Sequence, residues 1–152
     1  MNNSIEVYAP ATVANVACGF DVLGFALHEP GDKVILRKNQ STKVTISKIT
    51  GDEGKLPLSV AKNTAGLVIE HYLQHIGSDQ GIDLEIHKQM PLGSGLGSSA
   101  ASAAASLFAI NELMGSPLTR MELLPFAMEG ERIACGTAHA DNVAPAILGG
   151  FV

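Results

Sequence analysis

The chain has 152 residues, of which 46% are hydrophobic and 16% charged, a composition typical of a globular domain with its own core and unlike that of a disordered segment. Its net charge of −5 argues against a nucleic-acid-binding protein, which would carry a basic surface. The sequence shows no signal peptide and no apolar run long enough to span a membrane, and Cys18 and Cys135 lack metal-binding spacing. We therefore expect a cytoplasmic protein that binds neither nucleic acid nor membrane.

Strand patterns dominate the first 50 residues. We expect a strand over 6–8 that ends at Pro10, a strand over 25–27, a turn at 29–32, a strand over 33–37 and a strand over 43–49. The intervening segment, residues 11–24, follows neither the helical nor the strand period. It places Asn15 and Asp21 among apolar residues, so we expect both side chains to be buried and to require polar partners.

Helix signals begin after residue 60. A cap at Asn63 or Thr64 predicts a helix that continues to about residue 76. Alternating apolar residues predict a half-buried strand over 82–87, and an alanine-rich stretch predicts a helix over 98–114, which stops at the glycine that follows.

The last third of the chain holds a further helix and a change of pattern at its end. Thr119 and Glu122 form a capping box, and Pro125 is expected to kink or restart the helix that they begin. Residues 147–152 are typical of a glycine turn before a new strand, so we expect a portion of a longer protein. The order of elements predicts an α+β domain with helices on one face of a mixed sheet.

Between the strand at 82–87 and the alanine-rich helix lies the stretch Pro91-Leu92-Gly93-Ser94-Gly95-Leu96-Gly97-Ser98-Ser99-Ala100-Ala101. Three glycines at alternate positions disfavour regular structure and suit a loop whose backbone approaches a ligand closely. The N–H groups of such a loop and the N-terminus of the following helix, which carries roughly half a positive charge, together predict a phosphate site. A simple helix cap by Ser98 or Ser99 would not need the glycines.

Two common phosphate loops do not match this stretch. A Walker loop requires a lysine directly after its last glycine, where this chain has Ser98. A dinucleotide fingerprint counted from Gly93 requires a glycine where Ser98 again stands. Residues 95–101 instead resemble the loop of the GHMP small-molecule kinases.

A second polar segment precedes the apolar C-terminal run. Glu131 is followed by a turn at Gly136 and by a compact His-x-Asp-Asn cluster at 139–142. Spacing alone is equally consistent with a helix C-terminus followed by an Asx turn. With a phosphate loop in the same chain, Glu131 is the best acidic candidate for a Mg²⁺ ligand, together with a hydroxyl of Ser98 or Ser99, because hard cations prefer oxygen ligands.

Three blocks together resemble the homoserine kinase family of the GHMP superfamily: residues 10–24, 91–101 and 139–150. The glycine loop is typical of the whole superfamily, whereas the first and last blocks resemble the homoserine kinases specifically. The blocks span nearly all of the chain, but the family's C-terminal glycine motif and its substrate-carboxylate arginines are absent. The resemblance implies that residues 1–152 are the N-terminal, ATP-binding domain of a GHMP kinase, truncated before the C-terminal domain, with a fold like that of ribosomal protein S5 domain 2.

For the nucleotide, the resemblance implies that residues 91–101 wrap the ATP phosphates: Pro91, Leu92, Gly93, Ser94, Gly95, Leu96, Gly97, Ser98, Ser99, Ala100 and Ala101. Asn63 and Lys88 are weaker matches to nucleotide contacts. Ser99, or alternatively Ser98, and Glu131 would hold Mg²⁺. Valine at Gly97 is then expected to abolish ATP binding with little loss of stability, because the loop is expected to be exposed.

For the second substrate, the resemblance implies that Asn15 and Asp21 bind L-homoserine, with Asp21 facing the ammonium group. Asn142, helped by His139, would orient the side-chain hydroxyl, so Glu131 and Asn142 are the implied catalytic residues. The base stays unassigned, with Asp141 as a neighbour. A missing base is tolerable, because phosphoryl transfer depends mainly on positioning and charge neutralisation.

The implied activity is ATP- and Mg²⁺-dependent phosphorylation of L-homoserine, a step toward threonine. One alternative is a GHMP kinase for a sugar or a mevalonate-like alcohol, for which the carboxylate of Asp21 would have no ammonium partner. Another is a nucleotide-binding regulator without catalysis, which would not need both Glu131 and Asn142. The sequence leaves the oligomeric state open, and a homodimer is compatible with it.

Overall fold

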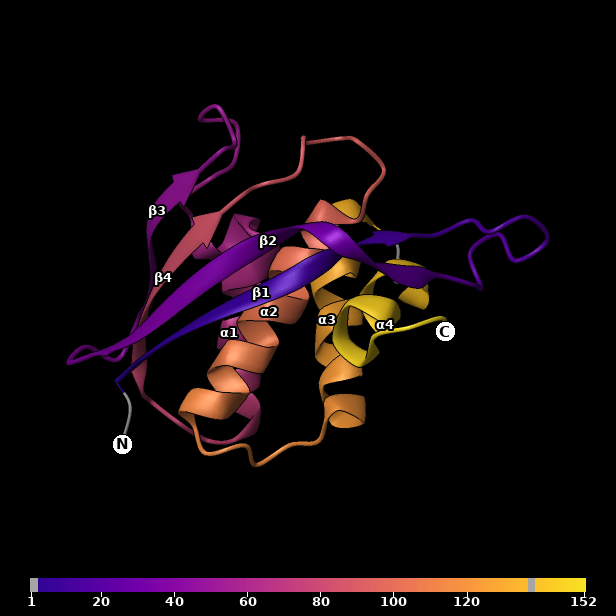
Figure 1. Ribbon diagram of the computed structural model, residues 1–152. Helices are drawn as coiled ribbons and strands as arrows, with labels where there is room; N and C mark the ends of the chain where they lie inside the picture. Colours follow the sequence, from indigo (N-terminus) through magenta and orange to yellow (C-terminus); the bar gives the residue numbers. More distant parts are fainter. Residues whose placement is uncertain (1–2, 137–138) are drawn as a thin grey trace.

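A mixed sheet of four strands forms one layer of the molecule, and the helices cover one of its faces (Figure 1). The computed structural model describes residues 3–136 and 139–152. Its strands are β1 (Ser4–Val13), β2 (Phe25–Asn39), β3 (Val44–Thr50) and β4 (Gly81–His87). They lie in the order β1-β2-β4-β3; β2 is antiparallel to both neighbours, and β3 is parallel to β4. The expected α+β class with a mixed sheet is confirmed.

The helices are α1 (Thr64–His75), α2 (Ser98–Leu113), α3 (Arg120–Cys135) and α4 (Ala140–Leu148), with a short 3-10 helix, η1 (Val60–Lys62), before α1. Helix α2 is central: it contacts β1, β2 and the other three helices, and it is buried on nearly all sides. Its alanines permit this close approach, and a helix that is apolar all round belongs in a core. The surrounding core therefore fixes where the N-terminus of α2 points.

Two strand boundaries differ from expectation. The first strand does not end at Pro10 but continues to Val13, because β1 is an edge strand, where a residue without an N–H group is tolerated. The turn expected at 29–32 does not reverse the chain. Residues 25–39 form the single strand β2, and the extra residues are taken up by a register shift, since Pro10 pairs with Gly31 and Thr12 with Ala26.

The helix boundaries agree more closely. Asn63 caps α1 by accepting from the N–H of Ala65, and the capping box of Thr119 and Glu122 is present at the start of α3. Helix α3 runs through Pro125 without restarting, so that part of the prediction is wrong. No helix in the described part of the chain is long and apolar enough to cross a membrane.

The last two residues extend alongside the start of β2, as the glycine turn at the end of the chain predicts. Phe151 forms a bridge with Phe25, and their rings stack with centroids 6.2 Å apart. The loop between β1 and β2, residues 14–24, projects beyond the same end of the sheet (Figure 1). Ser98, at the start of α2, contacts Asp32 of β2, and Asn142, in the first turn of α4, contacts Thr12 of β1. The N-termini of the two helices are thus both held by the β1–β2 pair.

Candidate active site

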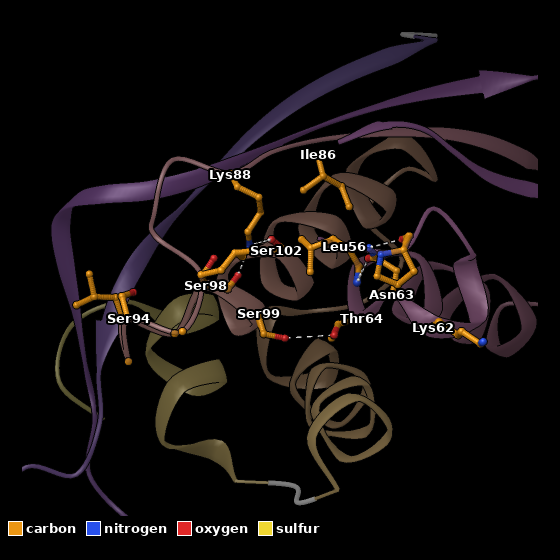
Figure 2. Close-up of a pocket in the computed structure, with 17 residues that line it drawn as sticks. Leu56, Lys62, Asn63, Thr64, Ile86, Lys88, Ser94, Ser98, Ser99 and Ser102 are labelled. Atoms are coloured by element: carbon orange, nitrogen blue, oxygen red, sulfur yellow. Dashed lines mark hydrogen bonds between the residues drawn. The ribbon is translucent and has the colours of Figure 1, made fainter. Parts of the chain in front are cut away.

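The glycine loop forms one wall of a cavity of about 400 Å³, opposite the N-terminus of α1 (Figure 2). This size is in the range of small-molecule sites. The lining residues are Leu56, Pro57, Lys62, Asn63, Thr64, Ala65, Ile86, Lys88, Leu92, Gly93, Ser94, Gly95, Leu96, Gly97, Ser98, Ser99 and Ser102. The cavity thus brings together most of the residues predicted to contact a nucleotide, whereas Pro91, Ala100 and Ala101 do not line it.

The three loop glycines have different surroundings. All adopt positive φ angles, 72° at Gly93, 75° at Gly95 and 65° at Gly97, which favour glycine. A Cβ atom at Gly93 or Gly95 would meet nothing within 4 Å. At Gly97 it would lie 2.1 Å from Thr12 Oγ1 and 2.8 Å from Asn142 Oδ1. The expectation that Gly97 can be replaced with little loss of packing is therefore wrong, and Gly95 is the better position at which to probe the loop.

The N-terminus of α2 lacks the side-chain cap that α1 and α3 possess. Gly97, not a serine, occupies its N-cap position, and among the described residues no side-chain cap hydrogen bond forms there. The hydroxyl of Ser98 donates to Asp32, and that of Ser99 lies 3.2 Å from the hydroxyl of Thr64. A simple serine cap is excluded, and the backbone donors of α2 are left for an anion beside the cavity.

The carboxylate of Asp32 is fully buried and accepts hydrogen bonds from residues just before and just after the glycine loop. Oδ1 of Asp32 accepts from the N–H groups of Gln89, at 2.8 Å, and Met90, at 3.3 Å, just before the loop. Oδ2 accepts from the hydroxyls of Ser98, at 2.8 Å, and Ser102, at 3.4 Å, just after it. Asp32 therefore fixes both ends of the loop relative to β2.

Lys88 is the counter-ion of Asp32, and its side chain is also buried. Its Nζ donates to Ser98 O at 2.8 Å and to Ser102 Oγ at 2.7 Å (Figure 2). With Asp32, these acceptors match the three donors of an ammonium group. Burial lowers the pKa of Lys88, and the charge of Asp32 opposes that shift. A nucleotide contact by Lys88 stays a prediction; its contacts here hold the first turns of α2.

Sequence reasoning missed Asp32, because Glu29-Pro30-Gly31-Asp32 has the composition of a turn. A signal was nevertheless present. Val34 and Leu36 are fully buried, and extending their period-2 alternation backward places Asp32 on the same face of β2. A carboxylate at a core position of a strand requires a cationic or hydrogen-bonding partner, and Lys88 lies on the neighbouring chain segment after β4.

The predicted metal ligands come from α2 and α3. Gly130 permits α3 to pack tightly on α1, since a Cβ atom there would lie 2.5 Å from Val68 Cγ1 and 3.2 Å from Thr64 Cγ2. The next residue, Glu131, is close enough to Lys88 for its charge to raise the pKa of that ammonium. The hydroxyl of Ser99 lies 3.2 Å from that of Thr64, the residue of α1 on which Gly130 packs.

One carboxylate and two hydroxyls are the kind of oxygen ligands that a hard cation such as Mg²⁺ prefers. The described residues contain no group of three or more His, Cys, Asp or Glu side chains that could hold a metal ion. A Mg²⁺ ion here would thus take further ligands from phosphate and water, as is usual for this ion. By residue type, Ser99 and Glu131 are suited to such an ion, and their role as its ligands stays a prediction.

A second polar cluster lies at the loop between β1 and β2. The N–H of Asp21 donates to Asn15 Oδ1 at 3.2 Å, and Nδ1 of His139 lies 3.9 Å from Oδ1 of Asp21. The structure thus brings together three of the residues predicted to bind the second substrate. The fourth, Asn142, lies in the first turn of α4, which His139 precedes, and contacts Thr12 beside the glycine loop.

The burial expected for Asn15 and Asp21 is not observed, and that prediction is wrong. Both residues are exposed, because the loop that carries them extends beyond the sheet and has no layer above it (Figure 1). Each has a φ of 58°, a conformation that Asn and Asp tolerate better than most residues. An exposed carboxylate beside an amide and an imidazole can receive a cationic ligand group.

Comparison with known proteins identifies the family. The model for the GHMP kinases N terminal domain matches residues 60–150, which include most of the residues that line the cavity, the glycine loop and α4. The chain belongs to the GHMP kinase family. The match confirms the family to which the glycine loop was assigned by its sequence.

This GHMP kinase domain is 60% identical, over 98% of its length, to a homoserine kinase of Chlorobium phaeovibrioides. It is also 60% identical to the homoserine kinase of Cytophaga hutchinsonii, whose crystal structure it matches over its whole length with a TM-score of 0.98. A mevalonate kinase of Methanococcus jannaschii shares the fold, with a TM-score of 0.73 over 97% of the chain at 17% identity. The chain covers 50%, 48% and 51% of these three proteins, so it spans about half the length of the relatives it matches.

We predict that Asp32→Asn lowers the free energy of unfolding by about 3–5 kcal/mol, because it leaves the Lys88 ammonium buried without its counter-ion. The double variant Asp32→Leu with Lys88→Met removes both charges and should recover most of the loss. Asp83→Asn is the matched control: this carboxylate lies on β4 and accepts hydrogen bonds from Asn39 and Thr45, away from the buried pair. Denaturant titration of the full-length protein measures all three. Wild-type stability in Asp32→Asn would show that the pair does not hold the loop.

Proposed function

We propose that this chain is the nucleotide-binding, N-terminal part of a homoserine kinase, which transfers the γ-phosphoryl group of ATP to the side-chain hydroxyl of L-homoserine, a step toward threonine. The proposal rests on one observation above all. The N-terminus of α2, which has no side-chain cap, follows the glycine loop, and Asn142 joins this loop to the polar cluster that contains the exposed carboxylate of Asp21. Relatives named homoserine kinase, at 56–60% identity over 95–98% of the chain, support it.

On the nucleotide side, the chain supplies backbone donors in place of a lysine-bearing loop. The N–H groups at the start of α2 and the unobstructed faces of Gly93 and Gly95 would receive the phosphates of ATP in the cavity. Ser99 and Glu131 would hold Mg²⁺, which supplies charge neutralisation to the phosphoryl group in transfer. The buried pair of Asp32 and Lys88 keeps these donors in place during the reaction.

On the acceptor side, the exposed carboxylate of Asp21 would pair with the ammonium group of homoserine, next to Asn15 and His139. Asn142 would then orient the hydroxyl toward the phosphate loop, which it adjoins through Thr12 and Gly97. Asp141 is a poor candidate base, since it is buried in the first turn of α4. A loose transition state needs little basic assistance, so positioning by Asn142 is sufficient.

No observation favours either alternative. A sugar or a mevalonate-like alcohol carries no ammonium group for Asp21, and the likeness to mevalonate kinases rests on the fold alone. A regulator without catalysis would have no use for a carboxylate at Glu131 near Lys88 and an amide at Asn142 beside the loop. We further propose a cytoplasmic location and no nucleic-acid partner, in keeping with the net charge of −5. The homodimer stays a prediction.

The full-length protein should phosphorylate L-homoserine in the presence of ATP and Mg²⁺, and galactose or mevalonate poorly if at all. A site that pairs with an ammonium group is expected to reject acceptors without one by a factor on the order of 10³ or more in kcat/KM. A coupled assay of ADP release across the three alcohols measures the preference. Faster turnover of galactose or mevalonate would refute the proposed substrate.

Glu131→Gln should leave the fold intact and lower kcat by roughly 10²-fold, because one negative charge is removed from the expected Mg²⁺ ligands. Raising the Mg²⁺ concentration should recover part of the activity. Glu129→Gln is the matched control: it lies on the same helix, is exposed and pairs with Arg132. Equal activity of the two variants would mean that Glu131 is not a metal ligand.

Gly95→Ala should weaken ATP binding at least tenfold, because a methyl group would stand where the backbone meets phosphate and each charge-assisted hydrogen bond contributes about 1.5–3 kcal/mol. Gly77→Ala is the matched control, since Gly77 also has a positive φ of 64° and open space around it, at the opposite end of α1. Both variants should lose similar stability. Calorimetric titration with ATP distinguishes them, and unchanged affinity in Gly95→Ala would exclude the loop as the phosphate site.

A further inference from the structure

Thr12 is buried near the end of β1 and does not line the cavity beside the glycine loop. A buried hydroxyl requires a hydrogen-bonding partner. The partner of Thr12 lies 130 positions away in the sequence: its Oγ1 donates to Oδ1 of Asn142 at 2.8 Å. This contact joins β1 to the first turn of α4.

The same residue holds the glycine loop. The backbone N–H of Thr12 donates to Leu96 O at 3.0 Å. The Cβ position of Gly97 lies 2.1 Å from the Thr12 hydroxyl oxygen and 2.8 Å from Asn142 Oδ1, so the loop packs directly on this pair. We call these three residues, Thr12, Gly97 and Asn142, the loop junction.

The junction determines what Asn142 can offer to a ligand. The oxygen and nitrogen of a side-chain amide occupy opposite branches of one planar group. Because Oδ1 is held against Thr12, the NH₂ group points away from the junction and presents hydrogen-bond donors. Such donors can bind a lone pair of an alcohol and so direct the alcohol, but they cannot remove its proton.

We propose that Thr12 is a positioning residue for phosphoryl transfer: its hydroxyl fixes the Asn142 amide so that the N–H groups face the acceptor alcohol at a set distance from the phosphate loop. The inference rests on the proposed function and deepens it, by naming the residue that couples the nucleotide side of the site to the acceptor side. Small errors in the position of reacting groups can cost about 100-fold in rate, which makes such a coupling consequential.

The test compares Thr12→Val with Thr12→Ser in the full-length protein. Valine keeps the shape of threonine and the backbone N–H to Leu96, but it has no hydroxyl; serine keeps the hydroxyl. Thr12→Val should lower kcat for homoserine by about 10- to 100-fold, while KM for ATP changes by less than about twofold. Thr12→Ser should retain most of the activity. Thr45→Val, which removes an exposed hydroxyl on β3, is the matched control.

A double-mutant cycle that combines Thr12→Val with Asn142→Ala then tests whether Thr12 acts through Asn142. If it does, Thr12→Val has no further effect on kcat once Asn142 is replaced. An equal loss in both backgrounds, or no loss in the wild-type background, overturns the inference. Should Thr12→Val fail to fold, Thr12→Ala and Thr12→Ser form the replacement pair, since both lack the methyl group and only serine has the hydroxyl.

The failure of this inference is distinguishable from the failure of the proposed function. If the wild-type protein does not phosphorylate homoserine, the proposed function fails and this inference fails with it. If the wild-type protein is active and Thr12→Val matches it in kcat, only the role of Thr12 is overturned.

Discussion

The buried ion pair of Asp32 and Lys88 is the interaction on which the geometry of the site depends. It links β2, the segment after β4 and the first turns of α2, and it lies directly behind the glycine loop. Within the loop, Leu96 and Gly97 contact Thr12 and Asn142, whereas Gly93 and Gly95 have open space around them. The buried carboxylate of Asp32 fixes both ends of the loop. Such a pair is costly to break from one side, because a lone charge would remain in the core.

Small residues set the distances between the elements that carry the chemistry. A Cβ atom at Gly24 would lie 1.8 Å from Asp141 O, so α4 can begin there only because that position is a glycine. Gly130 has the same effect between α3 and α1, and Gly97 between the loop and Asn142. Two of these contacts involve the functional residues directly: Gly97 packs against Asn142, and Gly130 immediately precedes Glu131. The family fold supplies the scaffold, and these close approaches place the functional groups on it.

Much of this arrangement can be predicted from sequence where local chemistry decides it. The glycine loop, the alanine-rich helix and the capping box of Thr119 and Glu122 follow from backbone preferences, and the structure confirms them. Prediction failed where pairing overrode local preference: the turn residues at 29–32 became part of β2 because β1 pairs alongside them. The same error concealed Asp32. The contact between Thr12 and Asn142 could not be predicted from spacing, because only the tertiary fold brings the two residues together.

The central claim is that one cavity and one polar cluster present ATP and an amino alcohol to each other across the junction of Thr12, Gly97 and Asn142. The most direct measurement is a crystal structure of the full-length protein with Mg²⁺, homoserine and a non-hydrolysable ATP analogue. We expect the triphosphate to lie against residues 93–99, the ammonium group at Asp21 and the side-chain hydroxyl within hydrogen-bonding distance of Asn142. A nucleotide bound outside the cavity, or an amino acid bound away from Asp21 and Asn142, would contradict it.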